Sequence, residues 1–189
     1  SAGKCVEWLL KQYPDAASFG VFCGKGNNGG DGLAIARMLM QQNYPVTIYI
    51  LEFGHKGTDD FQTNLARLHQ LTKADIHFIQ SEEQFHDLPK DQLVIDALFG
   101  SGLNRKLEGV TAKLVEHINN SGCDIISIDI PSGLFVDHSS KENTIINATH
   151  TLSFQCYKLA FLVAENQDYI GALHILDIGL HNDYYNTVH

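Results

Sequence analysis

Gly24-Lys-Gly-Asn-Asn-Gly-Gly-Asp-Gly32 decides the fold of this chain. It lies between an apolar run at 19–23, which predicts a strand, and an amphipathic run at 33–40, which predicts a helix. Its five glycines allow positive φ values and a close approach of the backbone to a ligand. The amides at the start of the following helix favour an anion such as a phosphate. Because the asparagines and Asp31 add polar side chains, the stretch predicts a site for a phosphorylated polar molecule together with a cation.

Other interpretations of this stretch stay open when it is taken alone. Asp31 can simply be the N-cap of a helix that follows a glycine-rich loop. The G-x-G-x-x-G pattern at Gly24, Gly26 and Gly29 is common, and no G-x-x-x-x-G-K-[ST] motif is present. Glu52 is the nearest candidate for the acidic residue of a dinucleotide fold, but it does not close the second strand cleanly. Residues elsewhere in the chain are therefore needed to choose among these interpretations.

Apolar runs alternate with helical stretches along the rest of the chain. This pattern predicts an α/β fold that is Rossmann-like and doubly wound, with a largely parallel sheet and helices on both faces in three layers. The strands are expected at 19–23, 45–51, 75–79, 92–99 and 123–130, followed by β-like runs at 150–154, 158–164 and 172–178. The helices are expected at 2–13, from the glycine-rich stretch to 42, at 58–71 and at 110–120. The strand order does not follow from the pattern.

Length and composition limit the function classes. The 189 residues predict one domain over 1–189, and the net charge of −9 argues against a nucleic-acid surface. No apolar stretch approaches the roughly 20 residues of a membrane span, and no signal peptide is visible. Four scattered cysteines without a C-x-x-C pair favour reduced thiols, a reducing compartment and a cytoplasmic location. The ten histidines show no metal-ligand spacing.

Three predicted strands end in polar, glycine-bearing turns. These turns are Asn27–Asp31, the stretch from Asp96 to Arg105, and Asp129-Ile-Pro-Ser-Gly133. Ordinary turn chemistry explains each of them separately. Parallel strands, however, place their carboxyl ends at the same edge of a sheet, where ligands bind near a switch in strand order. The coincidence of the three turns therefore favours a shared site.

The residue types in these turns indicate the chemistry of the site. Asn28, Asp96 and Ser132 carry oxygen ligands, and a single carboxylate among neutral oxygens suits a monovalent ion better than zinc, copper or calcium. The stretch 100–106 supplies amides, an arginine and a lysine that suit a pyrophosphate or a ribose phosphate. Asp129, at the end of its strand, is a candidate general acid and base.

Three motifs, GKGNNGGDG at 24–32, DALFGSGLNR at 96–105 and DIPSG at 129–133, together resemble the NAD(P)H-hydrate epimerase family, whose domain is called YjeF N-terminal. The resemblance implies an isomerase that interconverts the R and S forms of NADHX and NADPHX, which carry water on the nicotinamide ring. It implies one potassium ion per subunit, held by Asn28, Asp96 and Ser132, and a contact of Asp129 with the substrate near the reacting carbon. The substrate-binding residues that it implies, besides Asp129, are Asn27, Asn28, Gly29, Gly30, Asp31, Gly100, Ser101, Gly102, Leu103, Asn104, Arg105 and Lys106.

The resemblance carries further expectations. It implies a homodimer and a partner dehydratase, dependent on ADP or ATP, that is sometimes fused in the same chain. The family has an additional helical segment before the position of Ser1, so 1–189 is expected to lack that segment. Weaker matches are Lys158 and LDIGL at 176–180. The residues before Lys158 depart from the glycine and proline of the family, so Lys158 receives no role.

Two competing interpretations are a protein of another class, which binds without catalysis, and a different enzyme. A non-catalytic interaction or scaffold protein of the same fold would have no use for Asn28, Asp96, Asp129 and Ser132 together. A nicotinamide-dependent oxidoreductase is disfavoured by the doubled asparagine and by the lack of a clean ribose-binding acid after the second strand. For an epimerase, we expect the hydroxyl to leave as water with help from the ring nitrogen and to re-add from the other face, with Asp129 moving the proton.

Overall fold

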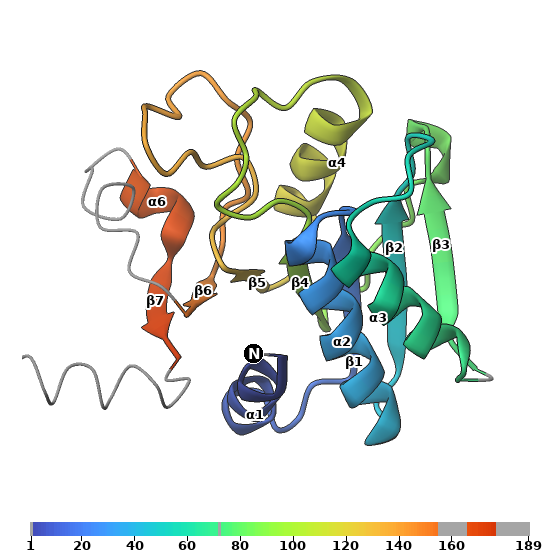
Figure 1. The fold of residues 1–189 in the computed structure, drawn as a ribbon. Coiled ribbons are helices and arrows are strands. Elements are labelled where there is room, and N and C mark those ends of the chain that lie inside the picture. Colours follow the sequence, from blue (N-terminus) through green and yellow to red (C-terminus); the bar gives the residue numbers. More distant parts are fainter. Residues whose placement is uncertain (1, 72, 155–165, 177–189) are drawn as a thin grey trace, which may run out of the picture.

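The computed structural model describes residues 2–71, 73–154 and 166–176. Within them, seven strands form one parallel sheet in the order β3-β2-β1-β4-β5-β6-β7 (Figure 1). The strands are β1 Ser18–Cys23, β2 Val46–Leu51, β3 Asp75–Ile79, β4 Gln92–Ala97, β5 Ile125–Ile128, β6 His150–Ser153 and β7 Ala172–Ile175. The order reverses between β1 and β4, as in doubly wound folds, so the predicted fold class is confirmed. The β-like run expected at 158–164 lies outside the described residues.

Helices cover both faces of the sheet. The α1, α2 and α3 helices (Ala2–Gln12, Asn27–Gln41 and Asp59–His69) pack with Phe19 and Val21 of β1 in one core. The α4 helix (Gly109–Asn119) packs with Phe22 of the same strand in the core on the other face. Alternate residues of β1 thus serve opposite cores, which is why its run reads as continuously apolar. The short elements are η1, Glu82–Gln84, and α6, Gln167–Ile170. Of the helices in the described part of the chain, none is long and apolar enough to cross a bilayer.

The start of α2 corrects the sequence-based expectation. The helix begins at Asn27 rather than near Leu33, so most of the glycine-rich stretch is helical, and Gly26 rather than Asp31 is the N-cap residue. Glycine is a poor helix former, but packing decides here. A Cβ on Gly32 would lie 2.6 Å from Cβ of Ala97, and one on Gly29 would collide with the carbonyl oxygen of Gly24. The glycines therefore let α2 begin directly against the ends of β1 and β4.

Two partly buried histidines, His150 of β6 and His174 of β7, lie against Trp8 of α1. Nδ1 of His150 lies 3.0 Å from Nε2 of His174, and the ring of Trp8 contacts both, edge-on to His150 and tilted to His174, with centroid distances of 5.0 and 4.8 Å. Burial lowers the pKa of both histidines below the ordinary 6.5, and the neighbouring His174 lowers that of His150 further. Only a neutral ring can accept the hydrogen bond of the other.

We expect the free energy of unfolding to fall as the pH drops from 7 to 5. The unfolded chain, with its ordinary pKa of 6.5, takes up these protons before the folded one, so the stability present above that value is lost below it. The rings are partly exposed, so the loss is about 1 kcal/mol or less. Urea denaturation of the wild type and of His150→Gln measures it. The same pH dependence in both proteins, or an equal change in the exposed His69→Gln, would contradict the assignment.

Candidate functional site

A cavity of about 740 Å³ lies at the carboxyl ends of β1, β4 and β5 and gathers all three predicted turns. Its lining residues come from the start of α2, the start of α3, the turns after β4 and β5, and the end of β6. They are Gly26, Asn27, Asn28, Asp31, Thr58, Leu98, Phe99, Gly100, Ser101, Gly102, Leu103, Asn104, Arg105, Ile128, Asp129 and Phe154. The edge of the sheet on which the sequence places a ligand therefore holds an open volume.

Gly100 is the point where the three turns meet. A Cβ at this position would lie 2.7 Å from Oδ2 of Asp129 and 3.3 Å from Cβ of Asn28. The next residue, Ser101, donates its backbone N–H to Oδ2 of Asp129 over 2.8 Å. Only glycine leaves room for both neighbours, so the turn after β4 brings Asn28 and Asp129 to the same side of the cavity.

Asp129 follows β5 with a left-handed backbone. Its φ of 75° is uncommon for a residue with a side chain, although Asp and Asn tolerate it best. Its N–H donates to the carbonyl oxygen of Leu152 over 2.7 Å, which keeps the residue tied to the end of β6. The carboxylate is partly buried, and one of its oxygens is held by Ser101. Strain of this kind gathers at functional sites.

Asp96 and Ser132 lie below the cavity and do not line it; both are fully buried. The Asp96 carboxylate accepts from Oγ of Ser132 at 2.5 Å, from N of Ser132 at 2.9 Å and from Oγ of Ser127 at 2.7 Å. A longer bond of 3.3 Å comes from N of Leu98. Burial raises the pKa of Asp96, and these four hydrogen bonds oppose the rise. Among the described residues, no basic side chain forms an ion pair with this carboxylate.

Asn28 supplies the unsatisfied group of the site. Both polar atoms of its amide are buried, and neither has a hydrogen-bond partner in the described part of the chain. A short path joins it to the buried pair, since Phe99 donates its N–H to Oγ of Ser132 over 2.9 Å and the next residue, Gly100, packs against Asn28. An amide oxygen without a partner, a hydroxyl and a buried carboxylate without a cationic partner are oxygen groups of the kind that hard cations bind.

The other residues predicted to bind the substrate fall into two groups, those that line the cavity and those that do not. Asn27, Asp31 and the stretch from Gly100 to Arg105 line the cavity, whereas Gly29, Gly30 and Lys106 do not. The two glycines pack against other segments, because a Cβ on Gly29 would collide with the carbonyl oxygen of Gly24 and one on Gly30 with the carboxylate of Asp60.

Sequence reasoning missed the contribution of α3. Thr58 lines the cavity and caps α3 by accepting the N–H of Phe61 at 3.2 Å. The carboxylate of Asp60, two residues further along, approaches Gly30 of α2. Burial, and then the charges of Asp60 and Asp129, raise the pKa of Asp31 to about 6. The Thr-Asp-Asp-Phe pattern at 58–61 marks a helix start, but nothing local shows that this start reaches the cavity.

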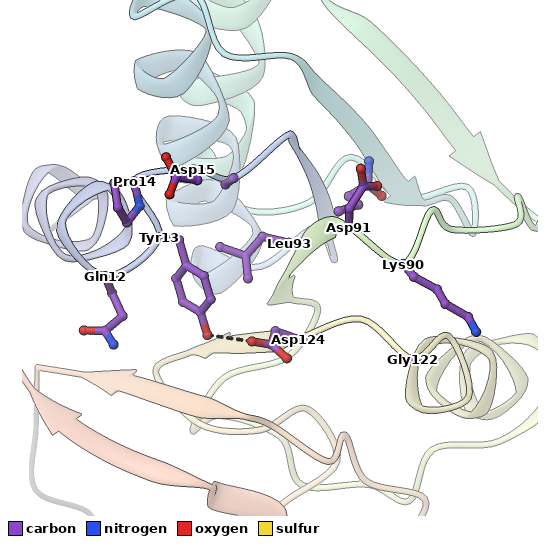
Figure 2. A pocket seen from close by; sticks show the side chains of 11 residues that line it. Gln12, Tyr13, Pro14, Asp15, Lys90, Asp91, Leu93, Gly122 and Asp124 are labelled. Atoms are coloured by element: carbon purple, nitrogen blue, oxygen red, sulfur yellow. Dashed lines mark hydrogen bonds between the residues drawn. The ribbon is translucent and has the colours of Figure 1, made fainter.

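A second cavity, of about 430 Å³, opens at the amino ends of the strands, opposite the first cavity (Figure 2). It lies between the end of α1 and the residues that precede β4 and β5, and it shares no residue with the first cavity. The Tyr13 hydroxyl donates to Oδ2 of Asp124 over 3.0 Å across it. Burial and this hydrogen bond raise the pKa of Tyr13. The bond ties α1 to the start of β5, so the visible role of this region is to fasten α1.

Comparison with known proteins supports the family resemblance that the three motifs indicate. A family model described as YjeF-related protein N-terminus matches residues 1–160. The chain is 34% identical over 161 residues to the NAD(P)H-hydrate epimerase of Oenococcus oeni, covering 85% of this chain and 74% of that one. It is 33% identical over 172 residues to the bifunctional NAD(P)H-hydrate repair enzyme Nnr of Escherichia coli, covering 89% of this chain and 32% of that one.

A solved structure shares the fold. The crystal structure of yeast ynu0 superposes with a TM-score of 0.69 over 80% of this chain and 67% of the yeast chain, at 22% identity. The chain thus spans about three quarters of the epimerase and about a third of the bifunctional enzyme.

Proposed function

Because this chain belongs to the YjeF-related N-terminal family, we propose that it is an NAD(P)H-hydrate epimerase, an isomerase that interconverts the R and S forms of NADHX and NADPHX. The names of its relatives support this activity. The observation that carries it is the Asp129 carboxylate, held by the Ser101 amide in a cavity that also contains the start of α2.

We assign the phosphates of the substrate to the start of α2 and to the turn after β4. The first N–H groups of α2, from Asn27 onward, are free of partners within the helix and lie at its positive end. The segment from Gly100 to Arg105 adds backbone amides and a guanidinium from the other side of the cavity. The nicotinamide ring then lies toward Asp129.

Asp129 moves the proton in the proposed reaction. The hydroxyl-bearing carbon is bonded to the ring nitrogen, so the C–O bond breaks as the nitrogen lone pair forms a C=N⁺ bond and protonated Asp129 gives its proton to the departing hydroxyl. The water so formed adds to either face of the iminium carbon, and Asp129 takes the proton back. Addition to the opposite face inverts the centre. One carboxyl thus serves as acid and then as base, and no proton is gained or lost.

One potassium ion per subunit is part of the proposal, with Asn28, Asp96 and Ser132 as its ligands. When bound, it would supply a fixed positive charge beside the cavity. The unpartnered amide of Asn28 and the buried carboxylate of Asp96 support this choice. The chain supplies one carboxylate among neutral oxygens, which suits a monovalent ion better than a calcium site with several carboxylates would.

We expect Asn28→Ala to raise the half-saturating potassium concentration about tenfold, because the ion loses one oxygen ligand. The measurement is the epimerisation rate as a function of potassium concentration at constant ionic strength. Asn27→Ala, one position earlier at the cavity wall, is the matched control and should leave the half-saturating potassium concentration unchanged. Equal potassium dependence of Asn28→Ala and the wild type would remove Asn28 from the ligand set.

A dehydratase that consumes the S form is the functional partner in this proposal. Relatives named bifunctional repair enzymes, about a third of whose length this chain covers, support a fused or separate second activity. We also propose that the protein acts as a homodimer in the cytoplasm.

Chiral separation of R- and S-NADHX, and of the NADPHX forms, tests the function directly. We expect a single pure isomer to approach its equilibrium mixture faster with the protein than without it, and faster still with potassium. An interconversion rate equal to that of buffer would contradict the proposal and favour a non-catalytic protein of the same fold.

A further inference from the structure

Lys25 is a buried cation within the glycine-rich stretch that the proposed reaction does not use. It lies between β1 and α2, and only 8% of its side chain is exposed. Its ammonium group donates to Oε2 of Glu52 over 2.5 Å and to the carbonyl oxygen of His55 over 2.6 Å. The other Glu52 oxygen accepts the N–H of Gly54 at 2.8 Å. A buried charge is retained only with such partners, so Lys25 and Glu52 together fix the loop 52–58.

The backbone of Lys25 binds the same loop at its far end. Its carbonyl oxygen accepts the N–H of Thr58 at 2.9 Å. Gly57 crosses directly above, with a φ of +85°, and a Cβ there would lie 2.5 Å from that oxygen and 2.8 Å from Cβ of Lys25. The loop is therefore held to one residue at its beginning, middle and end.

The loop ends at the wall of the cavity. Thr58 lines the cavity and caps α3, and Asp60 in the first turn of α3 packs against Gly30 of α2. Lys25 and Glu52 do not line the cavity themselves. Their contacts nevertheless reach Thr58, which does.

We infer that Lys25 is a positioning residue. Its contacts with Glu52, His55 and Thr58, which we call the clip, hold loop 52–58 across the end of β1. They thereby keep Thr58 and the start of α3 at the wall of the cavity. The inference rests on the proposed function for its catalytic consequence, but not for the clip itself. Since the clip acts on the wall of the cavity and not on Asp129, its loss affects substrate binding rather than the chemical step.

Hydrogen exchange tests the clip without any substrate. In Lys25→Met, we expect the amides of Gly54 and Thr58 to exchange at least about tenfold faster than in the wild type, because their local opening no longer breaks the buried contacts of Lys25. Lys4→Met is the matched control, since Lys4 forms an exposed pair with Glu7 at 3.6 Å. Unchanged exchange in Lys25→Met would overturn the clip.

Steady-state kinetics tests the positioning role. We expect Lys25→Met to raise KM for NADHX about tenfold while kcat stays within about twofold. Glu52→Gln keeps the shape of the pair and should shift KM in the same direction by less, which guards against misfolding of Lys25→Met. A loop that opens while KM stays unchanged in both variants would overturn the positioning role. An inactive wild type with a protected loop would instead contradict the proposed function and leave the clip intact.

Discussion

Asp129→Asn is expected to lower kcat for epimerisation by a factor of about 10²–10⁴, the usual contribution of a positioned acid and base. The amide cannot deliver a proton to the departing hydroxyl or take one from the water that re-adds. Nucleotide affinity should stay within a few-fold of the wild type, because the amides of α2 and of the turn after β4 are untouched. Chiral separation of NADHX measures the first quantity, and calorimetric titration with NADHX measures the second.

Asparagine is the right replacement at this position because it preserves the backbone. Asp129 has a φ of 75°, and Asn is among the few residues that accept that conformation readily. Its side-chain oxygen can still accept the N–H of Ser101. Asp124→Asn, at the other end of β5 and beside the second cavity, is the matched control and should keep wild-type kcat. A kcat for Asp129→Asn equal to that of the control would reject the assigned role.

Much of this site follows from the sequence because it depends on local patterns and one topological rule. The apolar runs fix the strands, and parallel strands bring Asn28, Gly100 and Asp129 to one edge, as the contacts around Gly100 show. The strand order, with its reversal beside β1, needs the structure.

The features of the site that the sequence does not predict depend on contacts between segments that are distant in the chain. Helix propensity suggests that α2 begins late, but the close approach of Gly32 to Ala97 allows it to begin at Asn27. Thr58 reaches the cavity, and Asp60 reaches Gly30, only because α3 packs on α2, and no local signal encodes that packing. The contacts of Lys25 with Glu52 and His55 cannot be predicted from local sequence either, because these partners lie 27 and 30 residues further along the chain.

Asp96→Ala is expected to lower the free energy of unfolding by about 3–5 kcal/mol, because several buried donors lose a charged acceptor at about 1–3 kcal/mol each. The carboxylate is fully buried and accepts four hydrogen bonds. Without it, the hydroxyl groups of Ser127 and Ser132 and the N–H of Ser132 lose their acceptor, and each buried donor left unsatisfied is costly. Urea denaturation, followed by circular dichroism, measures the change.

Potassium distinguishes a purely structural Asp96 from one that also holds the ion. If Asp96 is a ligand, potassium binds the folded wild type alone and raises its free energy of unfolding as the concentration increases, whereas sodium at equal ionic strength does so less. Asp96→Asn keeps the volume of the side chain but loses its charge, so it should be less stable than the wild type and show little response to potassium. Equal stabilisation of both proteins by potassium would place the ion elsewhere and leave Asp96 with only its hydrogen-bonding role between β4 and the turn after β5.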